Sequence, residues 1–394
     1  MSYHGLVLPA PAASFVEKGG RDVPLDLASV PEPLEPGRPL SLVTPQGQAL
    51  GLALADPENS RLRVMCRPED AFDAIGPAFF AARVERALAL RRTLGLTGER
   101  SAYRLVHGAG DGLPGFAADV LGSWAVLYVY SRAFVPHGQL LARAAMEQGG
   151  LRGVVVKVRS RGAASQQRVK QETVGEVPPE TLVVEERGVP FEVHLGRGLN
   201  TGLFTDMREH RHGLARFVAG RHVLNGFAYT GTLSVVAARA GATSVTTVDL
   251  SSGVLGWARD NFRLSGLDPF ARTCRFEASD VGRFLDEEAR AGRRFDVVLL
   301  DPPAFSAARG AAFAIDRDYP DLIAKACRLA PEGGLLWLAC NARTTTLLAL
   351  AEDGFRRARR SATLLELGGL PPDHPTVPAQ PEDRYLQVGV FRVE

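Results

Sequence analysis

The chain has 394 residues, of which 45% are hydrophobic and 23% are charged, so it can bury two or three packed cores. Its formal net charge of +2 is too small to indicate nucleic-acid binding by itself. No apolar run approaches the roughly 20 residues of a membrane helix, and the first residues lack the layout of a signal peptide. We therefore expect a cytoplasmic protein without membrane contact.

The four cysteines, Cys66, Cys274, Cys327 and Cys340, are scattered without the CxxC spacing that is typical of a zinc site. A disulfide framework is not expected in so large a chain. The cysteine pattern therefore favours a reducing compartment and predicts no bound metal.

Residues 1–75 are predicted to form a small β domain. The short alternating stretches 39–43 and 50–54 flank a turn signal at 44–47, in a region rich in proline and glycine. From 76 to 98, apolar residues recur at helical spacing, which predicts a connecting helix.

Residues 99–195 are predicted to form a central α+β domain. Its apolar runs and turn residues indicate strands near 103–106, 125–130, 154–158, 182–185 and 191–194, and a helix over 136–148.

From residue 196 to 394, strands alternate with helices. This alternation predicts an α/β domain whose mostly parallel sheet is covered by helices on both faces. The expected elements are strands at 223–224, 245–249, 297–301 and 335–339, and helices at 231–240, 253–265 and 320–329.

Two loops of this last domain predict a nucleoside pocket, because ligands of open α/β sheets bind beyond the carboxyl ends of the strands. The small-residue loop 225–231 follows the first strand, and Gly226 and Gly231 permit close backbone approach. Asp249, which ends the second strand, is placed to accept hydrogen bonds from both ribose hydroxyls. A packing role for the glycines is the alternative.

A dinucleotide is the alternative to a methyl-donor cofactor, but the G-x-G-x-x-G pattern that binds a pyrophosphate is absent. S-adenosylmethionine has no phosphate and needs only two glycines. Asp280 follows a third strand and is either an acceptor for an adenine amino group or a helix N-cap. The cofactor contacts expected here are Asn225, Phe227, Tyr229, Thr230, Gly231, Asp249, Leu250, Ser251, Asp280 and Asp301.

The fourth strand is followed by Asp301-Pro302-Pro303-Ala304-Phe305. The two prolines donate no backbone hydrogen bonds and hold the loop rigid, while a carboxylate and an aromatic ring can hold a planar base. An acid before a rigid turn is the plainer interpretation, but the place after this strand favours a reaction loop. Asp301, Pro302, Pro303 and Phe305 are therefore candidate catalytic residues.

With these motifs, the chain from about residue 100 onward resembles the bacterial large-subunit ribosomal RNA methyltransferases that carry a PUA domain ahead of a class I, Rossmann-like methyltransferase domain. The residues that carry the resemblance are Gly108–Gly115, Gly175–Pro179, Thr201–Arg208, Tyr229–Gly231, Asp301–Pro303, Asp373–Pro375, Pro381–Glu382 and Tyr385–Leu386. The first 70 residues match less well, and the resemblance implies a divergent PUA-like domain there.

The resemblance also implies that the segment from Thr201 to Arg211 closes over the methionine end of the cofactor. A carboxylate in it can accept from an amino group, and an arginine can pair with a carboxylate. The contacts expected in it are Thr201, Gly202, Phe204, Asp206, Arg208 and Arg211.

The methylated atom depends on Cys340 and Asn341. Methylation of cytosine carbon 5 requires a thiolate that adds to carbon 6, and Cys340 matches the cysteine that cytosine-5 members carry after the fifth strand. A buried structural cysteine is the alternative. Asn341 and Arg343 instead resemble relatives that methylate guanine nitrogens, in which Asp301 and Asn341 orient the base without a nucleophile. We favour cytosine-5 chemistry.

The predicted partner is large-subunit ribosomal RNA, and a homodimer is left open. Between Glu147 and Glu172 the chain has no acidic residue, so the cations there are candidates for phosphate contact or for a solvated strand face. An RNA-binding protein with a non-catalytic S-adenosylmethionine site is the alternative of another class. The candidate RNA contacts are Arg152, Lys157, Arg159, Arg161, Arg168 and Lys170.

Overall fold

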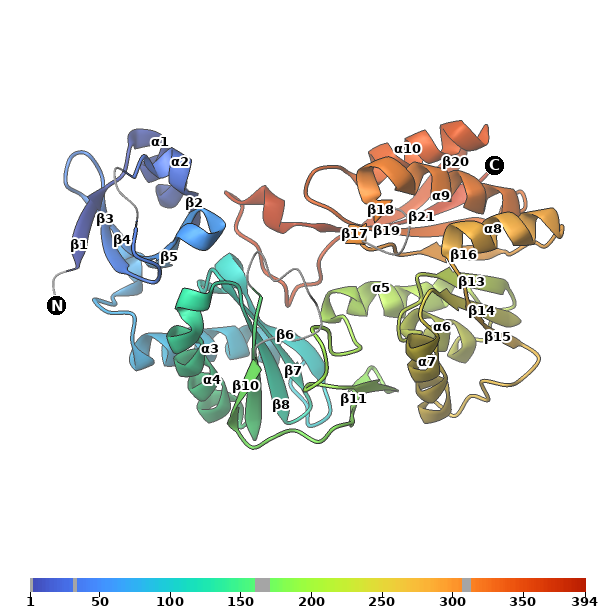
Figure 1. Ribbon diagram of the computed structural model, residues 1–394, viewed down its shortest axis with the longest axis horizontal. Coiled ribbons are helices and arrows are strands. Elements are labelled where there is room, and N and C mark those ends of the chain that lie inside the picture. Colours follow the sequence, from blue (N-terminus) through green and yellow to red (C-terminus); the bar gives the residue numbers. More distant parts are fainter. Residues whose placement is uncertain (1–2, 31–33, 160–170, 307–312) are drawn as a thin grey trace. The chain divides into compact units, whose positions relative to one another are not determined.

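The computed structural model describes residues 3–30, 34–159, 171–306 and 313–394, whose elements are labelled in Figure 1. Contacts group the chain into two compact units. Unit 1 comprises Met1–Val184, Val193–Thr201 and Pro372–Asp383, and unit 2 comprises Glu185–Glu192, Gly202–Pro371 and Arg384–Glu394. The sequence had indicated four consecutive parts, and the boundaries of those four domains stay a prediction.

The N-terminal part of unit 1 is a five-stranded sheet with strand order β1-β3-β4-β5-β2. The strands expected at 39–43 and 50–54 are confirmed as β3 and β4, whereas the likeness of this part to a PUA domain stays a prediction. Its elements are β1 (His4–Val7), α1 (Ala10–Glu17), β2 (Asp22–Pro24), α2 (Leu25–Ala28), β3 (Pro39–Val43), β4 (Ala49–Asp56) and β5 (Arg61–Cys66).

The second part of unit 1 is a five-stranded sheet with order β10-β9-β8-β7-β6, in which only the β8–β9 pairing is parallel among the pairs of the described residues. Strand β7 was not expected, because its six residues are all buried and show no alternation. The elements are α3 (Pro77–Thr93), β6 (Ala102–His107), β7 (Phe116–Leu121), β8 (Trp124–Val129), α4 (Val135–Gly149), β9 (Gly153–Val158) and β10 (Gln171–Gly175).

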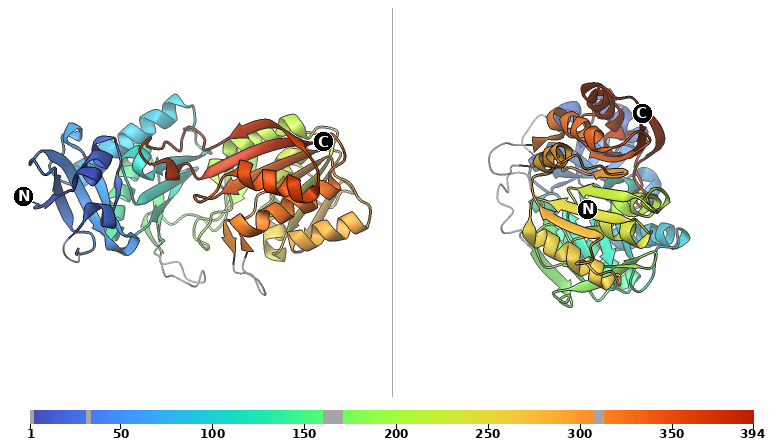
Figure 2. Two further views of the ribbon diagram at one scale, coloured as in Figure 1. Left: turned by 90° about the horizontal axis from the view of Figure 1, so that it is seen from above. Right: turned by 90° about the vertical axis from the view of Figure 1, so that its right-hand side faces the viewer.

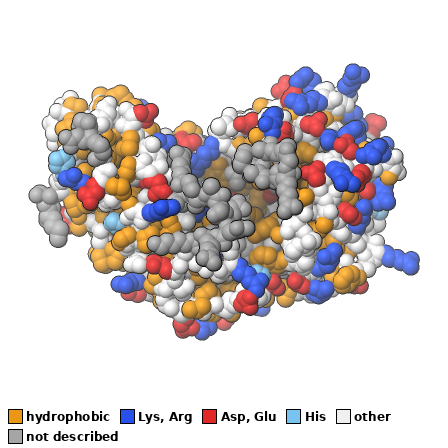
Figure 3. Space-filling view, in the orientation of Figure 1, with side chains coloured by type: hydrophobic (Ala, Val, Ile, Leu, Met, Phe, Trp, Pro, Cys, Tyr) orange, Lys and Arg blue, Asp and Glu red, His pale blue; other side chains and the backbone are white. Residues whose placement is uncertain are grey.

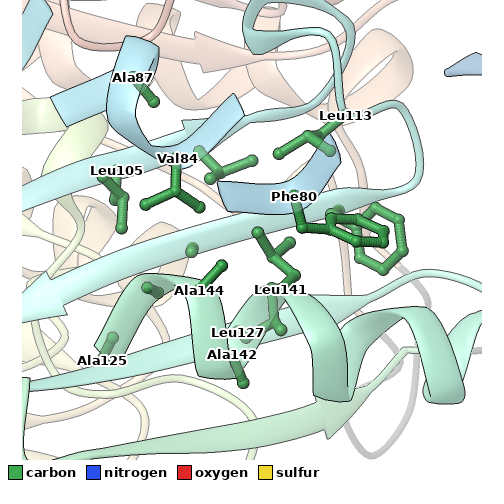
Figure 4. Close-up of a cluster of buried hydrophobic side chains, with 14 of the residues drawn as sticks. Phe80, Val84, Ala87, Leu105, Leu113, Ala125, Leu127, Leu141, Ala142 and Ala144 are labelled. Carbon is green, nitrogen blue, oxygen red and sulfur yellow. The ribbon is translucent and has the colours of Figure 1, made fainter. Parts of the chain in front are cut away.

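Helices α3 and α4 pack against each other and against this sheet. Phe80 and Val84 of α3 and Leu141 of α4 meet Leu105 and Leu127 of the strands in one buried cluster, shown in Figure 4. The apolar residues spaced along α3 thus bury a helix face, which explains the helical periodicity of this segment.

The strands expected near 182–185 and 191–194 are confirmed as β11 (Leu182–Glu186) and β12 (Val189–Val193), which pair with each other. Arg187 and Gly188 both have positive φ, 47° and 78°, which is the geometry of a two-residue type I′ turn.

Unit 2 contains a seven-stranded sheet with order β15-β14-β13-β16-β19-β21-β20, drawn from other directions in Figure 2. The five strands from β15 to β19 are parallel, and β21 is antiparallel to both of its neighbours. The expected α/β fold is confirmed, with a sheet that is mixed at one side. The strands are β13 (His222–Gly226), β14 (Ser244–Asp249), β15 (Cys274–Ala278), β16 (Val297–Leu300), β19 (Leu335–Asn341), β20 (Ala362–Gly368) and β21 (Leu386–Val393).

Helices cover both faces of this sheet. Leu224, Val298 and Leu336 point to a cluster with α8, α9 and α10, whereas their chain neighbours Val223 and Val297 point to the opposite cluster with α6. The helices are α5 (Arg208–Gly213), α6 (Thr232–Arg239), α7 (Ser252–Leu264), α8 (Val281–Arg290), α9 (Ile315–Leu329) and α10 (Leu347–Ala358), and a separate ribbon joins β17 (Phe305–Ser306) to β18 (Phe313–Ala314).

Phe80→Ala should lower the free energy of unfolding of unit 1 by about 3–5 kcal/mol, because it leaves a cavity in the cluster between α3, α4 and the sheet. Urea denaturation followed by circular dichroism measures the change. Phe270→Ala is the control, since that ring is 73% exposed and should change stability little. Equal effects of the two substitutions would contradict the packing described.

Candidate cofactor and base site

The loop after β13 has a strained backbone. Phe227 and Tyr229 have φ values of 60° and 50°, in the left-handed region that residues other than glycine rarely occupy. The backbone N–H of Ala228 donates to Val248 O at 3.0 Å, and Gly231 N–H donates back to Ala228 O at 2.9 Å. Such strain persists only where neighbours enforce it, and it is concentrated at binding sites.

Asp249 ties this loop to the next one. Its Oδ2 accepts from the backbone N–H of Tyr229 at 2.9 Å, and its Oδ1 accepts from that of Ser251 at 3.0 Å. The carboxylate is partly buried at the carboxyl end of β14. Ser251 caps α7 by accepting from Val254 N–H at 3.3 Å, while the Leu250 side chain is exposed. The predicted juxtaposition of loop 225–231 with Asp249 is therefore present.

Only one of the two polar atoms of the Asn225 side-chain amide forms a hydrogen bond among the described residues. Its Nδ2 donates to Ser234 Oγ at 2.9 Å, but its buried Oδ1 has no hydrogen-bond partner among the described residues. A buried acceptor without a partner at the end of β13 suits a ligand that brings a donor.

The segment that begins at Gly202 lies against the same loop. Thr230 Oγ1 donates to Gly202 O at 2.6 Å. Gly202 has a φ of 102°, and a Cβ there would come 2.1 Å from the Trp257 ring, so only glycine fits. The Tyr229 ring lies 5.4 Å from that of Phe204 and 6.2 Å from that of Trp257, centroid to centroid. Together these rings form an apolar wall beside Asp249.

Arg211 is held by protein groups. Glu186 accepts from its Nε and Nη2 at 2.8 and 2.9 Å, and Phe204 O accepts at 3.0 Å. The expectation that Arg211 pairs with a cofactor carboxylate therefore finds no support, because the protein's own carboxylate occupies its fork. Arg208 is also buried, and its Nε contacts Glu209 at 3.2 Å.

Asp301, in the reaction loop, lies near two charged side chains from another segment, Asp206 and Arg211. Burial raises the pKa of its carboxyl to about 7; the nearby Asp206 raises it further and Arg211 opposes the shift. Tyr385 donates its hydroxyl to Asp206 Oδ2 at 2.9 Å. The structure thus brings together Asp206, Arg211 and Asp301, whereas their contact with the cofactor stays a prediction.

The two prolines of the reaction loop differ in burial. Pro302 is buried and Pro303 is exposed. Phe305 begins β17, and its ring lies outside the described part of the structure.

Cys340 is the last buried residue of β19, with no exposed surface. Burial raises the pKa of its thiol to about 11, and the nearby Asp316 and Asp301 act in the same direction. Tyr319, whose hydroxyl donates to Leu300 O at 2.8 Å, is also close to Asp301 and Cys340, since both raise the pKa of its phenol. Asn341, the next residue, is exposed.

Two other predicted cofactor contacts, Asp280 and Thr201, form hydrogen bonds within the protein. Asp280 is exposed and caps α8 by accepting from Arg283 N–H at 2.9 Å, which is the alternative role that the sequence left open. Thr201 belongs to unit 1, where its carbonyl accepts from His194 N–H at 2.9 Å.

The candidate RNA contacts lie in unit 1. Lys157 is fully buried, its ammonium donates to Gly198 O at 3.0 Å, and burial lowers its pKa to about 8. This position argues against the predicted phosphate contact for Lys157. Arg161, Arg168 and Lys170 lie outside the described residues.

Arg152 and Arg159 flank β9, and each stacks on an aromatic ring. Their guanidinium carbons lie 4.6 Å from the ring centroids of Trp124 and Tyr128. Arg152 also pairs with the exposed carboxylate of Glu176 at 2.5 Å. Their role toward RNA stays a prediction.

Sequence reasoning gave no role to Glu186, Trp257, Tyr319 or Tyr385, each of which supports the site. Tyr385 was part of a noted motif, but nothing in its neighbours points to Asp206.

Within the described residues, no group of three or more His, Cys, Asp and Glu side chains is arranged to hold a metal ion. The search of those residues also finds no helix long and apolar enough to cross a membrane.

Asp301→Asn should remove a pH dependence of stability. Between pH 3.8 and about 7 the unfolded chain releases the Asp301 proton while the folded chain keeps it, so the free energy of unfolding falls as pH rises through this window. The asparagine variant should lack this fall, which urea titrations across the window measure. Asp260→Asn, at a half-exposed residue of α7, should keep it. If the free energy of unfolding of Asp301→Asn falls with pH as that of wild type does, Asp301 is not the group that titrates in this window.

Comparisons with known proteins agree with this geometry. The family model for S-adenosylmethionine-dependent methyltransferases matches residues 103–387. The chain is 34% identical over 369 residues to Ribosomal RNA large subunit methyltransferase I of Shewanella denitrificans, covering 91% of this chain and 90% of that protein. It is 32% identical over 364 residues to the protein of that name from Klebsiella pneumoniae strain 342, with 91% and 90% covered.

Solved structures share the fold. A protein from Streptococcus mutans assigned as a SAM-dependent methyltransferase has a TM-score of 0.86 at 23% identity, over 99% of this chain and 100% of that one. The methyltransferase SMU.776, solved in complex with SAH, has a TM-score of 0.88 at 23% identity with the same coverage. On the family model and the curated relatives, this chain belongs to the S-adenosylmethionine-dependent methyltransferases, in the family that contains the Ribosomal RNA large subunit methyltransferase I proteins.

Proposed function

We propose that this enzyme transfers a methyl group to a base of large-subunit ribosomal RNA. The observation that carries the proposal is the 34% identity, over 91% of the chain, to a protein named for that substrate. Transfer of label from S-adenosylmethionine to purified ribosomal RNA tests it, and no incorporation into unmodified RNA would favour an RNA-binding protein without turnover.

The described residues fit the cofactor. We assign ribose hydroxyls to the remaining lone pairs of Asp249, which already accepts from Tyr229 N–H, and Asn225 Oδ1 is a buried acceptor that needs a donor. The aromatic wall of Phe204, Tyr229 and Trp257 gives an adenine or sulfonium group an apolar neighbour. Bound S-adenosylmethionine supplies an electrophilic methyl group, and the protein contributes mainly by positioning the base in line with it.

For the base, we propose cytosine, with Cys340 as nucleophile. The thiol would give its proton to a carboxylate and its sulfur would bond to carbon 6, which makes carbon 5 nucleophilic. Carbon 5 would then take the methyl group as the sulfonium leaves as a thioether, and loss of the carbon 5 proton would break the sulfur–carbon bond. The raised pKa of the Cys340 thiol opposes the first step. Asp301 lies near the thiol and, once ionised, is the acceptor that we assign to its proton.

A second candidate, methylation of a guanine nitrogen, is favoured by one observation. Cys340 has no exposed surface and burial raises the pKa of its thiol, whereas the neighbouring Asn341 is exposed at the same strand end. In this alternative, Asp301 and Asn341 orient the base and no covalent bond to the enzyme forms.

Asp249→Asn should weaken S-adenosylmethionine binding roughly tenfold to a hundredfold, because hydrogen bonds to a charged acceptor contribute about 1.5–3 kcal/mol. Calorimetric titration measures the affinity. Asp260→Asn should bind as wild type does, since that carboxylate pairs with Arg263 on the side of α7. Unchanged affinity in Asp249→Asn would remove this residue from the cofactor site.

Cys340→Ala should abolish methyl transfer while leaving S-adenosylmethionine affinity within about twofold, because the thiol acts on the base and not on the cofactor. RNA that contains 5-fluorocytidine should trap wild type in a complex that survives denaturation, since fluorine at carbon 5 cannot leave as a proton. Gel electrophoresis detects the complex, and Cys340→Ala should not form it.

The matched control is Cys327→Ala, which removes another buried thiol of unit 2, one carried by α9. It should form the trapped complex. If Cys340→Ala instead transfers methyl groups at a near-normal rate, the target is nitrogen, and Asn341→Ala should then lose activity.

A further inference from the structure

Positive and negative side chains are interspersed over the face drawn in Figure 3. A polyanion binds best where positive side chains outnumber negative ones. Unit 1 contains such a place, a cavity of about 600 Å³. Its walls come from the end of α1, from α3, from the loop 109–112 and from the segment 375–378. The last two belong to motifs that neither the cofactor site nor the reaction loop uses.

Five cations line this cavity: Lys18, Arg21, Arg67, Arg83 and Arg86. Lys18 and Arg86 are exposed, whereas Arg21 is 7% and Arg83 is 4% exposed. We call this set the arginine cavity.

The carboxylates around the arginine cavity do not match its cations. Asp70 is shared by Arg83, its close partner, and by Arg21, at 3.5 Å. The exposed Glu69 lies 3.5 Å from Nη1 of Arg67. Asp111 lies on the wall, but Arg91 binds both of its oxygens, at 2.6 and 2.8 Å. The remaining positive charge calls for an anion.

The arginines also keep unused donors. Nε of Arg67 and Nε of Arg83 are buried and have no hydrogen-bond partner among the described residues. A buried N–H without an acceptor is unfavourable unless a ligand or water accepts from it. The Nε of Arg83 is therefore an unpartnered donor on a side chain that is more than nine-tenths buried.

Gly112 keeps the space beside Arg83 open. Its φ is 72°, and a Cβ there would come 3.0 Å from Cζ and 3.1 Å from Nε of Arg83. Any larger residue would thus crowd the guanidinium at the unused Nε. Burial, followed by the charges of Arg67 and Arg83, lowers the pKa of Arg21 to about 10, which an anion in the cavity would counteract.

We propose that the arginine cavity binds a backbone phosphate of the RNA substrate. Guanidinium forks match the oxygens of a phosphate, and a cavity of about 600 Å³ is large enough for a nucleotide. Lys18 and Arg86 attract the strand, and Arg67 and Arg83 donate to the phosphate oxygens. This inference rests on the proposed function for the identity of the polyanion.

Lys18→Glu combined with Arg86→Glu tests the proposal, since both side chains are exposed and their replacement spares the fold. Fluorescence anisotropy with a labelled ribosomal RNA fragment measures affinity over a range of salt concentrations. We expect affinity to fall by roughly 10-fold to 100-fold and the salt dependence to become shallower by about one to two counterions. S-adenosylmethionine affinity should not change.

The matched control is Arg92→Glu with Arg143→Glu, which makes the same change of charge in unit 1 on α3 and α4 but outside the lining of the cavity. It should bind RNA more tightly than the cavity variant does. Equal losses in the two double variants would overturn the site, as would wild-type affinity in the cavity variant.

Inorganic phosphate, added at constant ionic strength, distinguishes a free anion from RNA. If phosphate raises the melting temperature of wild type but not of the cavity variant, while both bind RNA equally, the occupant is a free anion and the RNA proposal fails. If wild type transfers no methyl group to RNA, the proposed function fails instead, and the measured RNA affinities still decide on the arginine cavity.

Discussion

The parallel pairing of β13, β14, β16 and β19 is the constraint on which the site depends. Because parallel strands end at the same edge of a sheet, the residues that follow them meet there however far apart they are in the chain. Asn225, Asp249, Asp301 and Cys340 each stand at such a strand end. The hydrogen bonds of Asp249 then join two of these loops, and they hold the strained residues Phe227 and Tyr229 in place.

Two carboxyl groups and one guanidinium lie close together at this edge of the sheet. Burial and the nearby Asp206 raise the pKa of Asp301, and Arg211, whose guanidinium also binds Glu186, offsets this shift only in part. A carboxyl that titrates near neutral pH is suited to exchange protons during a reaction. A cationic sulfonium bound near this carboxyl would favour the ionised form of Asp301.

The sequence predicted the α/β fold, most strand positions and the meeting of loop 225–231 with Asp249, because strand ends and glycines are local features. It did not predict that α9 begins at Ile315, five residues before Pro320, the proline taken for its start. It also missed that Lys157 is buried and that Arg211 pairs with Glu186, since those facts depend on contacts across long stretches of chain. The choice between cytosine and guanine is equally non-local, because it turns on how Cys340, Asp301 and Asn341 meet a base.

The segment Pro372–Asp383 has a consequence for biosynthesis. It belongs to unit 1 although the strands before and after it, β20 and β21, belong to unit 2. Within unit 1, Asp373 accepts from Arg104 N–H at 3.0 Å, and Gln380 accepts from Arg21 N–H at 2.5 Å. Asp373 and Gln380 are synthesised only after residue 371, so unit 1 cannot complete these polar contacts before then. Most of unit 2 is therefore synthesised before unit 1 has all of its residues, and a nascent chain stalled before this segment would expose an unfinished first unit to chaperones or proteases.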